Sequence, residues 1–240
     1  MDPLAEKYPN ISSYVYCADN PVKFIDPDGE RIFIANGSND FQHKTFSDMQ
    51  KLTNKTLVLL RSGEVVQLTS YKGDKSGIVE VGKRSLNRNR HMGTGLIAMI
   101  LGNKQKYLIT ETNDEKGDVT IPKNTGHDKD IPKGYDGLIK YNPNDNGKDI
   151  LQDNPNQGEH DLNSYGLKAF LQLGHEFIHA IKAMLGRSRD NIHEIYNDPD
   201  NEHSNRNITE EEVHTREKGN LLNKENCEPL RPIPISPSSK

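Results

Sequence analysis

The chain has 240 residues, 32% of them hydrophobic, which is enough for one main domain with short appendages. Its formal net charge of -4, from 31 basic and 35 acidic side chains that are well mixed, argues against a nucleic-acid partner, because such a partner requires a clustered basic face. The N-terminus lacks the basic and apolar regions of a signal peptide, and the longest apolar run, Leu96 to Leu101, is too short for a membrane span.

Residues 1–30 differ from the rest of the chain. Turn signals at Asn20-Pro21 and at Asp26 to Gly29 surround two short extended pieces, which bury little by themselves. At the other end, residues 229–240 are rich in proline and serine, a composition that favours a flexible tail. We therefore expect three parts: a leader over residues 1–30, a main domain over residues 31–228 and a tail over residues 229–240.

In the main domain, short apolar runs alternate with polar turns and with a few stretches of helical periodicity. The predicted strands are Ile32 to Ala35, Leu57 to Leu60, Val65 to Leu68, Ile78 to Val81, Tyr107 to Thr110 and Leu138 to Tyr141. The predicted helices are Phe41 to Leu52, Gly95 to Leu101, Tyr165 to Leu185 and Glu210 to Leu222. Two polar stretches, Thr112 to Lys133 and Asn142 to Asn163, are expected to be exposed loops. This mixed order predicts an α+β fold.

The long helix predicted over Tyr165 to Leu185 is amphipathic. Asn163 or Ser164 is placed to cap its N-terminus, and Gly186 is placed to end it. Residues at spacings of three and four form one apolar stripe, which consists of Leu167, Leu171, Gly174, Ile178, Ile181 and Leu185.

This helix also carries the motif His175-Glu176-x-x-His179. Two imidazoles one helical turn apart can direct nitrogens at a single metal ion from a rigid backbone. Glu176 is placed to hold a water on that ion and to take its proton, which is the general-base role in H-E-x-x-H zinc peptidases. The motif therefore predicts a zinc site with His175 and His179 as ligands and Glu176 as the catalytic base.

Catalytic zinc usually has a third protein ligand, and the residues alone leave its identity open. The downstream candidates are His193, His203, Glu210, Glu211, Glu212 and His214. The three glutamates also have an ordinary structural explanation, because acidic residues at a helix start stabilise the helix dipole. A hydrogen-bond donor for a developing oxyanion is expected nearby, and the candidates are Tyr165, Tyr196 and His214.

The leader resembles the end of the Rhs repeat-associated core, the module that closes the shell of polymorphic Rhs toxins. The matching residues are Asp2-Pro3-Leu4-Ala5-Glu6-Lys7-Tyr8-Pro9, Tyr14-Val15-Tyr16-Cys17, Asn20-Pro21-Val22 and Ile25-Asp26-Pro27-Asp28-Gly29. Such families place a variable toxin directly after this segment. The resemblance implies that the chain from about Glu30 onward is a toxin domain. The large upstream shell of such families does not precede this segment, so the chain looks like a C-terminal fragment or an orphan cassette.

A second resemblance covers separate blocks of the main domain. The segments His175-Glu176-Phe177-Ile178-His179-Ala180 and Glu211-Glu212-Val213-His214-Thr215, with Gly219-Asn220 after them, are similar to NleD-like effector metallopeptidases and to related toxin domains. Those families resemble gluzincins, so the resemblance implies a zincin-like fold with a glutamate as third zinc ligand. In gluzincin-like patterns a small residue commonly lies three positions after the ligand, and Thr215 has this place relative to Glu212, so the resemblance favours Glu212 over Glu211. Zincin-like enzymes bind substrate along a sheet edge, and Leu138 to Tyr141 is the strand expected there.

Together, the two resemblances imply a zinc endopeptidase toxin, carried into a target cell by a specialised secretion system. Its partners would be a protein substrate in that cell and a cognate immunity protein. Two alternatives remain: an Rhs-associated nuclease toxin, which would degrade nucleic acid independently of Glu176, and a non-enzymatic interaction module, which would not be toxic.

Overall fold

The structure is a computed structural model, and it describes residues 32–38, 40–83, 90–113, 119–124, 126–144, 168–186, 195–197, 207–228 and 230. For residues 195–197 and 207–211 only the backbone is described. The expected leader over residues 1–30 lies outside these ranges, as does the expected tail apart from Leu230.

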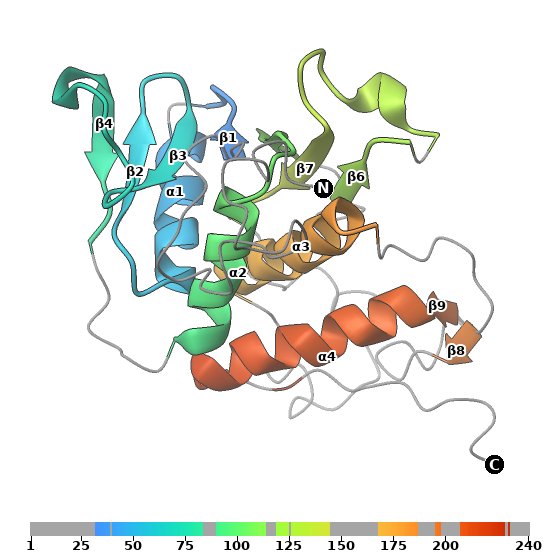
Figure 1. Cartoon of the computed structure of the whole chain (residues 1–240). Helices are drawn as coiled ribbons and strands as arrows, with labels where there is room; N and C mark the ends of the chain where they lie inside the picture. The colour runs from blue at the N-terminus through green and yellow to red at the C-terminus, as the bar shows by residue number, and fades with distance from the viewer. Residues whose placement is uncertain are drawn as a thin grey trace, which may run out of the picture.

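The described part of the chain is a mixed α/β structure around one open sheet of seven strands (Figure 1). The strands in spatial order are β4 (Ile78–Val81), β2 (Leu57–Leu60), β3 (Glu64–Gln67), β1 (Ile32–Ile34), β5 (Tyr107–Glu111), β7 (Gly137–Tyr141) and β6 (Val119–Pro122). The central strands β1, β5 and β7 are parallel, and all other neighbours are antiparallel. A separate two-stranded ribbon joins β8 (Ile195–Asn197) to β9 (Asn207–Thr209).

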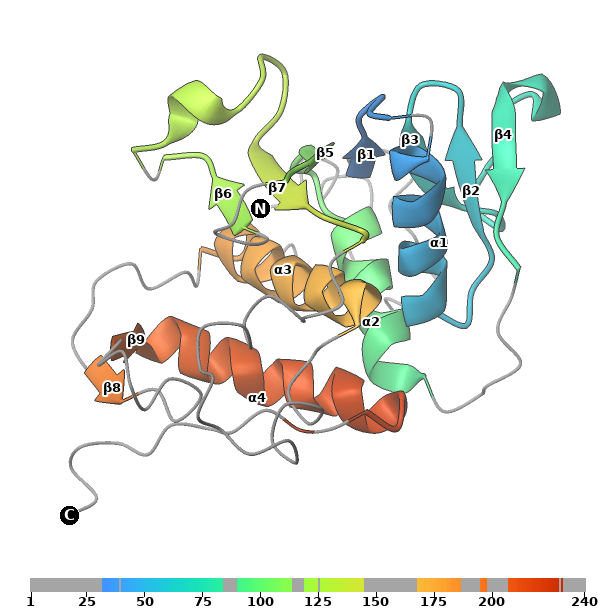
Figure 2. The ribbon, with the colours of Figure 1, turned by 180° about the vertical axis from the view of Figure 1, so that it is seen from behind.

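Four α-helices accompany the sheet in the described residues: α1 (Phe41–Leu52), α2 (His91–Leu101), α3 (Ala169–Met184) and α4 (Glu210–Glu225). Two short 3-10 turns, Lys75–Gly77 and Asp128–Asp130, lie in the connections before β4 and before β7. Helix α3 lies between strands β6 and β7 on one side and helix α4 on the other, and this order is the same in the front and back views (Figures 1 and 2).

The core forms where α1 and α3 meet the central strands. Aromatic side chains fill much of it: Phe46, Tyr107, Tyr141 and Phe177 each have 0% of their surface exposed. Helix α3 is buried far beyond its apolar stripe, because the sheet, α1, α2 and α4 all pack against it. Its position is therefore fixed from several sides, which is what a rigid site requires.

The predicted α+β class is compatible with this fold, and the strands and helices named from periodicity are all present. The stretch Thr112 to Lys133 was expected to be a loop, but it contains β6. That strand has only four residues, ends in Pro122 and lies in a stretch dominated by Asn, Asp, Gly and Pro, and it joins the sheet by pairing with β7.

The start of α3 differs from the predicted start, whereas its predicted end is confirmed. The helix begins at Ala169 with Lys168 as its N-cap residue, whereas the cap was expected at Asn163 or Ser164, which lie outside the described residues. At the other end Gly186 has φ of +62° and donates its N–H to the carbonyl of Ala183, so the glycine stop is confirmed.

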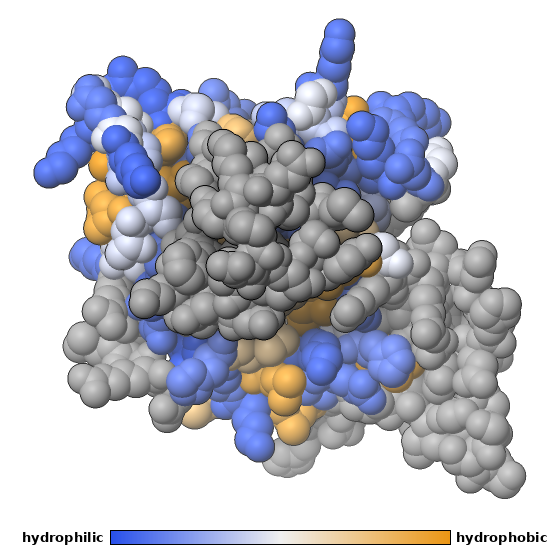
Figure 3. All heavy atoms as spheres, viewed as in Figure 1, coloured by the Kyte–Doolittle hydropathy of each residue, from blue (hydrophilic) through white to orange (hydrophobic). Residues whose placement is uncertain are grey.

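The surface of the described residues is mostly hydrophilic on the face shown in Figure 3. Hydrophobic side chains gather near β4, where Val79 and Val81 are 46% and 49% exposed, and along α4, where Leu221 is 45% exposed. None of the described helices has the length and apolar character needed to cross a membrane.

Candidate metal centre

Helix α3 brings His175 and His179 together. They are four residues apart on a continuous helix, so both rings lie on one face, 4.8 Å apart between centroids and nearly perpendicular. Their Nε2 atoms are 3.1 Å apart. The side chains are only 12% and 20% exposed, so the pair lies at the border of the core.

Helix α4 approaches this face closely because α3 has a glycine there. A Cβ atom on Gly174 would lie 2.8 Å from Cδ1 of Leu222 and 3.2 Å from Cδ2 of Leu52. Leu222 on α4 and Leu52 on α1 are both almost fully buried in this contact. Gly174 therefore allows α4 to pack directly beside the histidine pair.

Glu212, in the first turns of α4, completes a compact group with the two histidines. Its Oε2 lies 3.3 Å from Nε2 of His175 and 3.2 Å from Nε2 of His179. The three donor atoms thus form a nearly equilateral triangle. Two ligands at about 2.05 Å from an ion in tetrahedral geometry are about 3.3 Å apart, so the triangle has the size of one tetrahedral face. The group could hold a metal ion.

The electrostatics of Glu212 favour its charged form. Burial alone would raise the pKa of this carboxyl, but hydrogen bonds from His175 and His179, together with their charge, outweigh burial and hold the pKa well below its usual range. The other carboxylate oxygen, Oε1, accepts a hydrogen bond of 3.0 Å from Nε of Arg216, one helical turn further along α4. An ionised carboxylate is the form that a metal ion binds.

Glu176 lies outside the three-donor group, although it is adjacent to His175 in sequence. Its side chain is buried, and Oε2 accepts a 2.7 Å hydrogen bond from the hydroxyl of Thr120 on β6. The same hydroxyl lies 3.0 Å from the backbone carbonyl of Glu176. The carboxylate that the sequence indicates as a base is thus joined by a hydrogen bond to β6, one of the two edge strands of the sheet.

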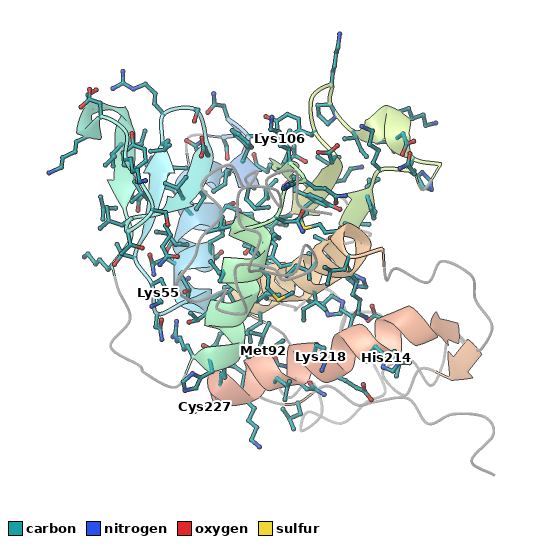
Figure 4. All side chains as sticks on the ribbon, in the orientation of Figure 1. Lys55, Met92, Lys106, His214, Lys218 and Cys227 are labelled. Carbon is teal, nitrogen blue, oxygen red and sulfur yellow. The ribbon has the colours of Figure 1, made fainter. Side chains whose placement is uncertain are left out.

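The other sequence candidates are placed elsewhere or are not described. His214 is on α4, where Figure 4 labels it; it is 55% exposed, and its Nδ1 lies 3.1 Å from Oε2 of Glu217. It does not belong to the donor group. Tyr196 is in β8, but its side chain is not described. The remaining candidates outside the described side chains are Tyr165, His193, His203, Glu210 and Glu211.

The expected substrate strand requires a correction. Leu138 to Tyr141 was assigned to a sheet edge, but β7 pairs with β5 on one side and with β6 on the other, so its main chain is already hydrogen-bonded on both sides. The edge strand beside α3 is β6, which has no second neighbour among the described residues. The wrong assignment arose because β6 was expected to be part of a loop, which left β7 as the predicted edge strand.

Sequence reasoning did not single out Thr120 and Arg216. Thr120 had no local signal, because its contact with Glu176 depends on how the sheet lies over α3. Arg216 did have one: it is four residues after Glu212, and an acidic and a basic residue at this spacing on a helix form ion pairs.

Comparisons with known proteins gave no match: no protein-family model, no curated protein and no solved structure matches this chain. What the protein does is therefore inferred from its own residues and their geometry.

Proposed function

We propose that the protein is a zinc-dependent endopeptidase with a zincin-like active site, in which His175, His179 and Glu212 bind the zinc ion and Glu176 is the general base. One observation carries the proposal: the donor atoms of the three residues lie 3.1 to 3.3 Å apart on two packed helices. Two imidazoles and one carboxylate are a donor set that suits zinc, and three protein ligands with one open position are typical of catalytic zinc.

The chemistry divides between the ion and the chain. Zinc, when bound, lowers the pKa of a coordinated water to about 7 and polarises a carbonyl group. Glu176 takes a proton from the attacking water and passes it to the leaving amine. The hydroxyl of Thr120 orients the carboxylate of Glu176 for this task, since the two are joined by a 2.7 Å hydrogen bond.

The substrate is a protein segment in extended form. An extended peptide pairs with an exposed sheet edge through its main chain, and β6 is the edge strand nearest to the donor group. A peptide lying along β6 would pass beside Glu176, because Thr120 in the middle of that strand contacts Glu176 directly.

The biological setting is a toxin or effector that acts on a protein in a target cell. This part of the proposal is supported by the resemblance of residues 1–30 to the end of an Rhs core. It implies delivery by a specialised secretion system and a cognate immunity protein that protects the producing cell.

The decisive experiment expresses the wild type and Glu176→Gln in a bacterial cytosol and follows growth. Glu176→Gln replaces the base with an amide of the same shape, so we expect the purified variant to stay folded and to keep about one zinc per chain, while growth inhibition is lost. Sequencing of new protein N-termini in the wild-type culture then identifies the cleaved bonds.

The matched control is Glu217→Gln, the same chemical change at a 49% exposed carboxylate on α4. It should be as toxic as the wild type. Equal toxicity of Glu176→Gln would refute peptidase action, and degradation of nucleic acid by both proteins would favour the nuclease alternative. An absence of toxicity in the wild type, with no new N-termini, would favour the interaction module.

A further inference from the structure

Arg216 is a buried charge beside the candidate metal centre. Its side chain is only 5% exposed, and its Nε donates a 3.0 Å hydrogen bond to Oε1 of Glu212. A buried guanidinium needs a counter-charge, because removing an unpaired charge from water is strongly unfavourable. Among the described residues, Glu212 supplies that counter-charge, whether or not a metal ion is present.

The two oxygens of Glu212 therefore have separate partners. Oε1 is held by Arg216, and Oε2 is directed at His175 and His179. A carboxylate with both oxygens free can bind a metal through either or both of them, and binding through both would fill the position that catalysis requires open. With Oε1 hydrogen-bonded to Arg216, Oε2 is the oxygen that faces the two histidines.

We infer that Arg216 is a positioning residue, which restricts Glu212 to one-oxygen binding of the metal and keeps the three donors assembled before the metal arrives. The inference rests on the proposed function in taking Glu212 as a ligand. It adds that the ligand is oriented by a charged hydrogen bond from its own helix, as ligating carboxylates are in other metal sites.

The test titrates the metal-free wild type and its variants with Co²⁺, whose visible spectrum reports coordination number, and measures affinity by competition with a chromophoric chelator. Arg216→Met removes the hydrogen bond and frees Oε1. We expect its Co²⁺ affinity to fall about 10- to 100-fold and its visible bands to weaken, as coordination by both oxygens raises the coordination number.

Two further variants make the result specific. Lys218→Met removes a cation from an exposed position on the same helix, where Figure 4 labels it, and should leave affinity and spectrum unchanged. Arg216→Lys keeps a positive charge but loses the planar guanidinium, so it should also alter the spectrum. If circular dichroism shows that Arg216→Met does not fold, Arg216→Lys decides the question.

Wild-type affinity and spectrum in a folded Arg216 variant would overturn the inference. Tighter binding would overturn it too, since Arg216 would then act by repelling the ion. A wild type that binds neither Co²⁺ nor Zn²⁺ would overturn the proposed function together with the inference, whereas an intact wild-type site with unaffected Arg216 variants would overturn the inference alone.

Discussion

Helices α3 and α4 contribute to the same three-donor group by different physical means. On α3, local helix geometry is sufficient, because residues four apart always share a face and His175 and His179 need nothing else to meet. On α4, Glu212 reaches the pair because the two helices pack against each other, with a close approach at Gly174. A local motif can therefore be recognised in any sequence, while its completion depends on tertiary structure.

The largest effect should come from removing one donor from either helix. His175→Ala and Glu212→Ala should each lower the metal content of the purified protein from about one ion per chain to nearly none after dialysis, because two remaining donors hold zinc weakly. Metal analysis by mass spectrometry measures this directly.

Glu211→Ala is the matched control for the α4 donor. Neighbours on a helix point about 100° apart, so only one of the two glutamates can reach the ion, and Glu211→Ala should keep its metal. Loss of metal in Glu211→Ala with retention in Glu212→Ala would reverse the ranking of the two. Glu212 would then not be the residue that α4 contributes to the donor group.

A smaller effect is expected from forcing the helices apart. Gly174→Val places a side chain where Cβ alone would already lie 2.8 Å from Leu222, so we expect the free energy of unfolding to fall by about 1–3 kcal/mol and zinc affinity to fall with it. Urea denaturation and zinc competition measure the two quantities.

Gly95→Val tests whether such a loss is specific to the contact. Gly95 is also a helical glycine, in α2, but a Cβ there would meet nothing within 4 Å. Stability and affinity should stay close to those of the wild type. If Gly174→Val also left the free energy of unfolding and the zinc affinity unchanged, close packing at Gly174 would not be what brings Glu212 to the histidines.

The difference between local geometry and tertiary packing also explains how much of the fold the sequence could predict. Strands with a strong apolar run, such as β2 and β5, and helices with clear periodicity were found within a few residues of their ends. The strand β6 was missed, because its four residues acquire their extended form from pairing with β7. That single omission also moved the expected substrate edge from β6 to β7.

For the site, the sequence alone placed the two histidines on one helix face. It could only name Glu212 among several candidates, since its distance from them depends on the docking of α4. The contact of Thr120 with Glu176 depends on how β6 lies over α3, so no local motif contains it. The contact of Arg216 with Glu212 lies within one helical turn and could have been predicted from the spacing of four residues.

The smallest expected effects come from Gly219 on α4. This residue lies next to Nδ1 of His175, whereas the other ring nitrogen, Nε2, faces Glu212. A Cβ atom at this position would lie 3.6 Å from Nδ1 of His175, an ordinary contact. Gly219→Ala should therefore stabilise the protein by about 0.5–1 kcal/mol through helix propensity, without changing zinc affinity.

Gly219→Asp would add a carboxylate that can accept a hydrogen bond from Nδ1 of His175. A ligating histidine is held in orientation when its other ring nitrogen donates to a carboxylate, so zinc affinity should rise by up to about fivefold, or about 1 kcal/mol. Zinc competition against Gly219→Ala isolates this gain from any change in helix stability. Equal affinity in the two variants would mean that packing against α4 already fixes the ring of His175, and α4 would then contribute to the histidine pair as well as supplying Glu212.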